Sequence, residues 1–133
     1  MFTVTKKIEF CYGHRLLRYE GKCRHLHGHN GVLEVDLATD ALDDRGMVLD
    51  FGEIKRRLKS WIETTLDHQM ILCKDDPMVP VLREKGEQFQ VIDDNPTAEN
   101  LAKLIFNEAR AQGLPVREVR LWETPTSRAS YRG

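Results

Sequence analysis

The chain has 133 residues, of which 41% are hydrophobic and 31% charged, and these proportions fit one compact folded domain. Its 20 basic and 21 acidic residues nearly balance, which excludes the strongly basic composition typical of nucleic-acid-binding proteins. No stretch approaches the ~20 apolar residues that a membrane span needs, and no export signal is visible at the amino terminus. We therefore expect a single domain over residues 1–133, located in the cytoplasm, with neither a nucleic-acid nor a membrane partner.

The first predicted element is a strand. Between Phe2 and Phe10, apolar residues alternate with polar ones in the period-two pattern of a half-buried strand, interrupted only by Lys6. The same alternation returns between Leu33 and Leu37, after a polar stretch that contains glycines. We expect these two strands to pair in antiparallel fashion.

A helix is predicted after the second strand. Asp50 stands at its start and Glu53 lies three positions on, at the spacing of a capping box. Apolar residues then recur at helical spacing to about residue 66, which predicts one face packed on the sheet. The basic residues within Lys55–Lys59 are expected on the solvated face of this helix.

The segment from Asp67 to Asp94 is predicted to be irregular, because Pro77 and Pro80 interrupt it. Phe89–Ile92 is expected to form one short strand there. The longer stretch Met78–Gln90 is expected to form either an extra hairpin or a loop that covers the active site.

A second helix is predicted to open at Pro96 and Thr97 and to end at Gly113. A last strand follows from Val116 to Thr124. Strands and helices that are segregated along the chain indicate an α+β fold, a small antiparallel sheet with two helices on one face. Such a sheet has open edges and an uncovered second face, so we expect a homo-oligomer whose subunits share the active site.

Histidines give the strongest chemical signal in the sequence. Four of the five precede residue 30, at His14, His25, His27 and His29. If the second strand begins near residue 27, the side chains of His27 and His29 point to the same face. Pairing of the two strands would bring His14, which follows the first strand, beside them.

Three neutral imidazoles are the ligand set of a catalytic zinc site, whose fourth position stays open for water or substrate. The spacing alone also allows a closed structural site in which Cys23 or His25 supplies the fourth ligand. The three cysteines form no dense framework, and we expect them to be reduced thiols.

Further motifs extend over most of the chain. They are Gly13-His14-Arg15, Cys23 followed after three residues by His27-Gly28-His29, Asp50-Phe51, Asp67-His68, Pro96-Thr97-Ala98-Glu99-Asn100-Leu101 and Trp122-Glu123-Thr124. In this combination the chain resembles the 6-pyruvoyl-tetrahydropterin synthase and 6-carboxytetrahydropterin synthase family. The three-residue gap between Cys23 and His27 is similar to the bacterial 6-carboxytetrahydropterin synthase branch, whereas the animal pyruvoyl branch usually has a longer gap.

The resemblance implies the tunnelling fold (T-fold), an oligomeric barrel that is commonly a hexamer built as a dimer of trimers. It implies a Zn2+ cofactor and a lyase that converts 7,8-dihydroneopterin triphosphate to 6-carboxytetrahydropterin, with release of acetaldehyde and triphosphate, in queuosine and deazapurine biosynthesis. One alternative is a 6-pyruvoyl-tetrahydropterin synthase, which retains all three side-chain carbons. Another is a non-catalytic module in which zinc only joins the first two strands.

Roles for single residues follow from the resemblance. His14, His27 and His29 would hold zinc, and His25 would occupy a variable position of the motif. Cys23 would act as a base, its thiolate favoured by zinc and by the cationic neighbours Lys22 and Arg24. The remaining implied site residues are Asp67 and His68, which transfer protons across a subunit interface, and Glu123, which binds the pterin edge of the substrate. Cys11 and Cys73 match no catalytic position and are expected to be packing residues.

Overall fold

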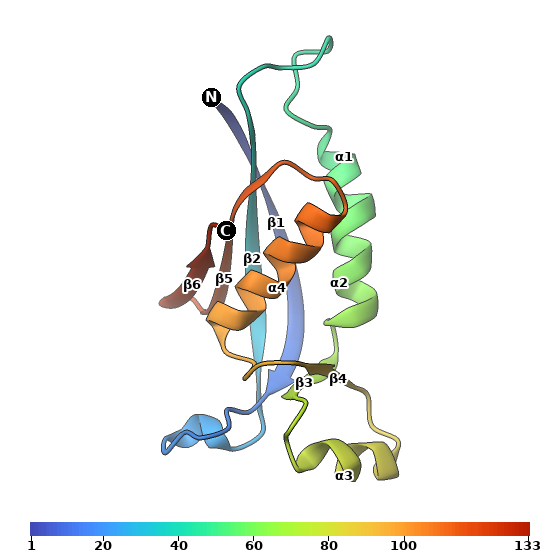
Figure 1. The fold of residues 1–133 in the computed structure, drawn as a ribbon, viewed down its shortest axis with the longest axis vertical. Helices are drawn as coiled ribbons and strands as arrows, with labels where there is room; N and C mark the ends of the chain where they lie inside the picture. Colours follow the sequence, from blue (N-terminus) through green and yellow to red (C-terminus); the bar gives the residue numbers. More distant parts are fainter.

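A six-stranded sheet forms the centre of the structure, a computed structural model that describes residues 1–133 (Figure 1). The strands are β1 (Phe2–His14), β2 (His27–Thr39), β3 (Gln69–Cys73), β4 (Phe89–Ile92), β5 (Val116–Thr124) and β6 (Ser127–Tyr131). They lie in the order β4-β3-β1-β2-β5-β6. The predicted antiparallel pairing of β1 with β2 is confirmed and continues through β5 and β6, whereas β3 runs parallel to β1 and to β4.

Helices cover one face of this sheet. The helical segments α1 (Phe51–Ile54), the π-helical η2 (Lys55–Lys59) and α2 (Ser60–Thr65) follow one another without a break, as the periodicity predicted. They share that face with α4 (Ala98–Ala111), as Figure 1 shows. The α+β architecture with helices on one face is therefore confirmed.

Strand alternation and helix periodicity build a common core. Every second side chain of β1 and β2 points to the helices, and these include Ile8, Phe10, Leu33, Val35 and Leu37. Ile54, Leu58, Ile62, Leu101 and Ile105 from the helices pack against them and are fully buried. Each such side chain contributes about 1.5–3 kcal/mol through burial, which fixes the register of the strands.

The two long helices begin at the predicted caps. The Asp50 carboxylate accepts a hydrogen bond from the Gly52 amide (2.7 Å), and the Thr97 hydroxyl accepts one from the Asn100 amide (3.1 Å). The expected capping box at Glu53 does not form. Its carboxylate instead pairs with Arg56 and Arg57 on the next turn of the helix, so the cap consists of Asp50 alone.

The predicted irregular segment contains more regular structure than expected. β3 was missed because its short apolar run lacks alternation, as is usual for a strand buried on both faces. The hairpin or loop expected over Met78–Gln90 is instead a helix, α3 (Met78–Lys85), followed by β4. Pro80 falls in the first turn of α3, where its missing amide proton removes no helical hydrogen bond.

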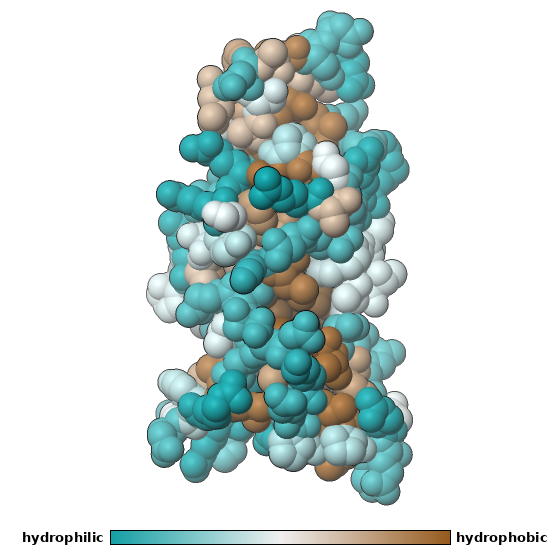
Figure 2. Space-filling model, viewed as in Figure 1, coloured by the Kyte–Doolittle hydropathy of each residue, from teal (hydrophilic) through white to brown (hydrophobic).

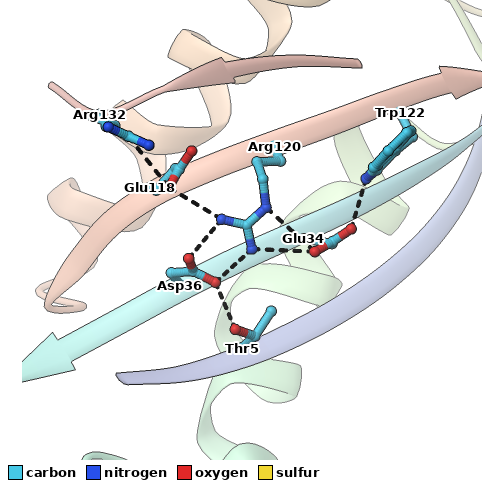
Figure 3. Close-up of polar contacts among 7 residues, drawn as sticks. All are labelled: Thr5, Glu34, Asp36, Glu118, Arg120, Trp122 and Arg132. Atoms are coloured by element: carbon cyan, nitrogen blue, oxygen red, sulfur yellow. Dashed lines mark hydrogen bonds and ion pairs between the residues drawn. The ribbon is translucent and has the colours of Figure 1, made fainter. Parts of the chain in front are cut away.

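The face of the sheet away from the helices carries charged side chains in place of apolar ones. Arg120 on β5 lies among the carboxylates of Glu34, Asp36 and Glu118 (Figure 3). Its guanidinium donates to both oxygens of Asp36 at 2.6 and 2.7 Å. The Arg120 side chain is only 12% exposed, so these contacts form a half-buried polar layer across β2 and β5.

Apolar side chains also reach the surface. Figure 2 shows brown, apolar atoms at the end of the molecule where β1 begins, among teal hydrophilic ones. Phe2, Leu42, Met47 and Phe51 are each more than one third exposed there and line a hollow of about 360 Å³. No helix of the chain has both the length and the apolar character needed to cross a lipid bilayer.

Candidate active site

Three histidines meet where β1 ends and β2 begins. His14 is the last residue of β1 and lies opposite His27, the first residue of β2. His29 lies opposite Tyr12, two residues further along the pair. Because alternate residues of a strand share a face, all four side chains lie on the same side as the core.

Backbone carbonyls orient two of the three imidazoles. Nδ1 of His14 is 2.7 Å from the carbonyl oxygen of Pro96, and Nδ1 of His27 is 2.7 Å from that of His25. Since a carbonyl only accepts, each Nδ1 donates to its carbonyl, and Nε2 is the ring nitrogen left to act as a ligand. Nε2 of His14 lies 3.1 Å from Nε2 of His29, and the buried Nε2 of His27 has no hydrogen-bond partner.

This donor set fits a zinc ion. Ligand atoms of all three histidines lie within 4.8 Å of one another. Two nitrogens bound at ~2.0 Å to one tetrahedral ion would be about 3.3 Å apart, close to the 3.1 Å between His14 and His29. The orphaned nitrogen of His27 costs free energy unless something binds it, and a metal ion would do so.

Burial keeps His14 in the form that binds a metal. Its side chain is 2% exposed, and burial is the main cause that lowers the pKa of His14 to about 4. The hydrogen bond to Pro96 opposes this shift, and the neighbouring His27 and His29 reinforce it. His14 is therefore neutral at physiological pH, as a metal ligand must be.

Glu123 on β5 reaches the same cluster. Its two carboxylate oxygens lie 3.9 Å from Nε2 of His14 and from Nε2 of His29. The register of β5 against β6 shifts between Trp122 and Thr124, around Glu123. The structure thus places the predicted substrate-binding carboxylate at the edge of the histidine cluster.

Sequence reasoning missed Tyr12, which also borders the cluster. The centre of its ring lies 5.3 Å from that of His14 and 5.7 Å from that of His29, and its buried hydroxyl has no partner. Burial, and then the charge of Glu123, raises the pKa of Tyr12, so the phenol stays protonated. The available signal was the alternation of Phe10, Tyr12 and His14 on one face of β1.

Asp67 and His68 follow α2 and form the expected pair. Oδ2 of Asp67 lies 2.9 Å from Nδ1 of His68. Neighbouring residues can meet in this way because His68 has a φ of 60°, in the left-handed region that few residues other than glycine occupy. The His68 side chain is 72% exposed and projects from the protein surface.

Cys11 lies beside this pair, contrary to its expected role in packing. Its position in β1 points away from the core, and its Sγ lies 3.5 Å from both ring nitrogens of His68. Its backbone amide donates to Oδ1 of Asp67 (3.0 Å). Strand alternation predicted that the Cys11 side chain points outward, but no sequence pattern linked Cys11 to Asp67 and His68, which lie 56 and 57 positions further along the chain. Cys73 is buried, and all three cysteines are free, as predicted.

Cys23 stands apart from both clusters. It lies in the short 3-10 helix η1 (Lys22–Arg24), its side chain is half-buried, and it belongs to neither group of ligand atoms. Its backbone carbonyl accepts a hydrogen bond from Leu16 (2.8 Å). The side chain of His25 is exposed and accepts from Arg24 (3.3 Å), so it does not join the histidine cluster.

Contacts that the sequence did not reveal hold the segment that carries Cys23. Arg15 binds both carboxylate oxygens of the buried Asp76, with its Nε 2.8 Å from Oδ2. The side-chain amide of Asn95 binds the amide and the carbonyl of Leu17 at 2.9 and 3.0 Å. Together with the bond from His14 to Pro96, these contacts tie the carboxyl end of β1 and the following loop to residues 76–96.

A large hollow borders residues of both groups, the histidine cluster and the Asp67–His68 pair. It has a volume of about 730 Å³, within the range of small-molecule sites. Tyr12, His27, His29 and His68 are among the residues that line it. The hollow is therefore large enough to hold a small-molecule ligand.

Comparisons with known proteins agree with this geometry. The family model described as 6-pyruvoyl tetrahydropterin synthase matches residues 3–133. A relative from Rickettsia conorii named 6-carboxy-5,6,7,8-tetrahydropterin synthase is 40% identical, over 94% of this chain and 96% of its own. Relatives of the same name from Aquifex aeolicus and Haemophilus influenzae are 35% and 32% identical, over 97% and 98% of this chain and 96% and 99% of theirs.

Solved structures share the fold. An uncharacterized protein from Wolinella succinogenes superposes with a TM-score of 0.82 at 31% identity, covering 99% of this chain and 98% of that one. The 6-pyruvoyl tetrahydropterin synthase of Caenorhabditis elegans does so with a TM-score of 0.75 at 26% identity, covering 99% and 95%. The T-fold expected from the sequence is thereby confirmed, and the chain belongs to the 6-pyruvoyl tetrahydropterin synthase family.

Proposed function

We propose that this protein is a zinc-dependent 6-carboxy-5,6,7,8-tetrahydropterin synthase that acts on 7,8-dihydroneopterin triphosphate in queuosine biosynthesis. The observation that carries the proposal is the convergence of three imidazoles beside Glu123 in a chain that is 40% identical to a relative of that name. The relatives match over nearly their full length, which supports one activity for the whole chain.

The metal would be held by His14, His27 and His29. When bound, zinc supplies Lewis acidity that acidifies the side chain of the substrate. The three imidazoles would bind the metal, and the carbonyls of Pro96 and His25 fix two of the rings.

The protein's own residues would bind the pterin and move protons. Cys23, beside Lys22 and Arg24, would remove a proton from the substrate side chain. His68, paired with Asp67 at 2.9 Å, would serve as the second proton-transfer group. Glu123 would accept two hydrogen bonds from the amino and N3 groups of the pterin ring, and a carboxylate is well suited to this planar edge.

The activity is proposed for a cytoplasmic homo-oligomer, a hexamer built as a dimer of trimers. The unpaired edges of β4 and β6 support an assembly that extends the sheet from one subunit to the next. The exposed apolar side chains at the start of β1 support a second contact surface.

Product analysis tests the proposal. The zinc-loaded protein is incubated with 7,8-dihydroneopterin triphosphate, and products are identified by mass spectrometry with trapping of volatile aldehydes. A carboxy synthase yields 6-carboxytetrahydropterin, acetaldehyde and triphosphate. A protein carrying His27→Ala, stripped of metal, serves as the inactive control.

Two other results would replace the proposal. A pterin product that retains all three side-chain carbons, without acetaldehyde, identifies a 6-pyruvoyl-tetrahydropterin synthase, the activity in the name of the similar C. elegans structure. Recovery of unchanged substrate by a folded, zinc-loaded protein identifies a module in which zinc has only a structural role.

A further inference from the structure

Few contacts hold the loop that carries Cys23 to the body of the protein. Residues 15–26 connect β1 to β2 and project from the lower end of the sheet in Figure 1. The polar contacts of this loop with residues beyond β1 and β2 are the ion pair of Arg15 with Asp76 and two hydrogen bonds between Leu17 and Asn95. The place of the Cys23 thiol therefore depends on two side-chain anchors.

Asn95 fixes both the position and the orientation of Leu17. Its side-chain oxygen accepts from the Leu17 amide (2.9 Å), and its side-chain nitrogen donates to the Leu17 carbonyl (3.0 Å). Leu17 forms no backbone–backbone hydrogen bond of its own. The amide of the preceding residue, Leu16, donates to the carbonyl of Cys23 (2.8 Å). Cys23 is therefore bound to the chain neighbour of the residue that Asn95 holds.

The same short segment also holds a predicted metal ligand. The carbonyl oxygen of Pro96, the residue after Asn95, lies 2.7 Å from Nδ1 of His14. The backbone of Asn95 is fixed independently of its side chain, because its carbonyl accepts from the Thr97 amide (2.8 Å) and from the Asn100 side chain (2.9 Å). Residues 95 and 96 thus contact both the loop and the histidine cluster.

We propose that Asn95 is a positioning residue, which holds the Cys23 thiol at a fixed place relative to the histidine cluster through the backbone of Leu17. A side-chain amide suits this task because it carries both a donor and an acceptor and can match both polar groups of one residue. The inference rests on the proposed function in one respect, the role of Cys23 as a base. A misplacement of about 1 Å can cost 100-fold in rate, so the anchor would affect catalysis although Asn95 touches no reacting atom.

Alkylation of Cys23 tests the anchor without substrate. The full-length protein is treated with iodoacetamide, and the peptide that contains Cys23 is followed by mass spectrometry, with Cys11 as the internal reference. The Cys23 side chain is half-buried, and Asn95→Ala removes both bonds that hold its loop through Leu17. We expect Cys23 to react about tenfold faster, because each lost hydrogen bond favours opening of the loop by roughly twofold to tenfold.

Two controls accompany this measurement. Zinc content should not change in Asn95→Ala, because the carbonyl of Pro96 stays in place beside His14. Asn107→Ala, at an exposed position of the same helix α4, should leave the reaction of Cys23 as in wild type.

Kinetics with 7,8-dihydroneopterin triphosphate test the consequence for catalysis. In Asn95→Ala, kcat should fall by about 100-fold, with KM nearly unchanged because Glu123 and the histidines keep their places. In a Cys23→Ala background the same change should have almost no further effect, since Asn95 then has no base to position. Asn95→Asp has the same size and sets a carboxylate oxygen against the Leu17 carbonyl. It should give the same changes, and it replaces Asn95→Ala if that variant does not fold.

Unchanged alkylation of Cys23 in the Asn95 variants would overturn the inference, whatever the activity of the wild type. Faster alkylation with an unchanged kcat, or a loss of rate that persists in full without Cys23, would also overturn it. Loss of zinc would show that Asn95 acts through His14 instead. A wild-type protein that leaves the substrate unchanged would refute the proposed function, and alkylation would still decide whether Asn95 holds Cys23.

Discussion

At the scale of single residues, His27 and His25 make a matched test of the metal ligands. His27 has an unpartnered buried Nε2, whereas the exposed side chain of His25 takes no part in the cluster. His27→Ala should therefore lose most of the zinc of the histidine cluster. His25→Ala should keep it, because only the backbone carbonyl of His25 contacts His27 and alanine retains that carbonyl.

Metal content after dialysis, measured by atomic emission, checks this prediction. Unchanged zinc in His27→Ala, or loss of zinc in His25→Ala, would contradict the ligand assignment.

A second prediction concerns Cys23 as a base that does not bind zinc. Its absence from both ligand clusters predicts that Cys23→Ala keeps its zinc and its assembly. Turnover should fall by about a hundredfold to ten-thousandfold, the usual effect of removing a general base. Steady-state kinetics and metal analysis of the same preparation check both parts, and full activity without the thiol would exclude Cys23 from the mechanism.

At this scale the sequence motifs anticipated some contacts and not others. The two-residue spacing of His27 and His29 predicted that their side chains lie on the same face of the strand, because strand alternation is a local property. The contacts of Cys11 with His68, of Arg15 with Asp76 and of Tyr12 with the histidine cluster depend on tertiary packing between distant segments. No pattern within one segment could reveal them.

At the scale of elements, Arg120 joins β5 to β2 on the face away from the helices (Figure 3). The Arg120 hydrogen bond lowers the pKa of Asp36 despite opposing burial. Burial would raise the pKa of Glu34, but hydrogen bonds from Trp122 and Arg120 lower it. Arg120→Met leaves these carboxylates without their partner and should cost about 3–5 kcal/mol of unfolding free energy at neutral pH.

The pH dependence of this loss has a definite sign. Carboxylates with lowered pKa values stabilise the folded protein above their unfolded pKa of about 4, and this contribution disappears as pH falls through the folded values. The difference in unfolding free energy between wild type and Arg120→Met, measured by urea unfolding, should therefore become smaller below about pH 4. Arg132→Met is the control, since Arg132 is 76% exposed and pairs with Glu118 at 3.4 Å, and it should change stability by less than about 1 kcal/mol.

The elements that could be predicted from the sequence are those in which hydrophobic residues recur with a clear strand or helix period. β1, β2, the helix from Phe51 and α4 each bury one face against a common core, so hydrophobic alternation marks them. β3 and α3 were missed for separate reasons. A short strand buried on both faces shows no alternation, and prolines near the start of α3 suggested a break although they are compatible with a first turn.

At the scale of the whole molecule, the chain presents surfaces that a neighbour could cover. β4 and β6 each leave one edge without a partner strand, and Phe2, Met47 and Phe51 are exposed together at one end. The proposed base and the proposed proton-transfer pair also lie in separate places, since Cys23 contacts neither Asp67 nor His68 within the chain. These features favour an active site that is completed between subunits.

Mixing two inactive variants tests that arrangement. In Cys23→Ala the His68 imidazole is intact, and in His68→Ala the Cys23 thiol is intact. If one site takes its thiol from one subunit and its imidazole from the next, random mixing restores both groups in roughly a quarter of the sites. Activity should therefore return after subunit exchange, which native mass spectrometry of differently tagged chains can verify. If exchange is complete and no activity returns, both groups act from the same chain, and closure of the loop that carries Cys23 toward His68 must bring them together.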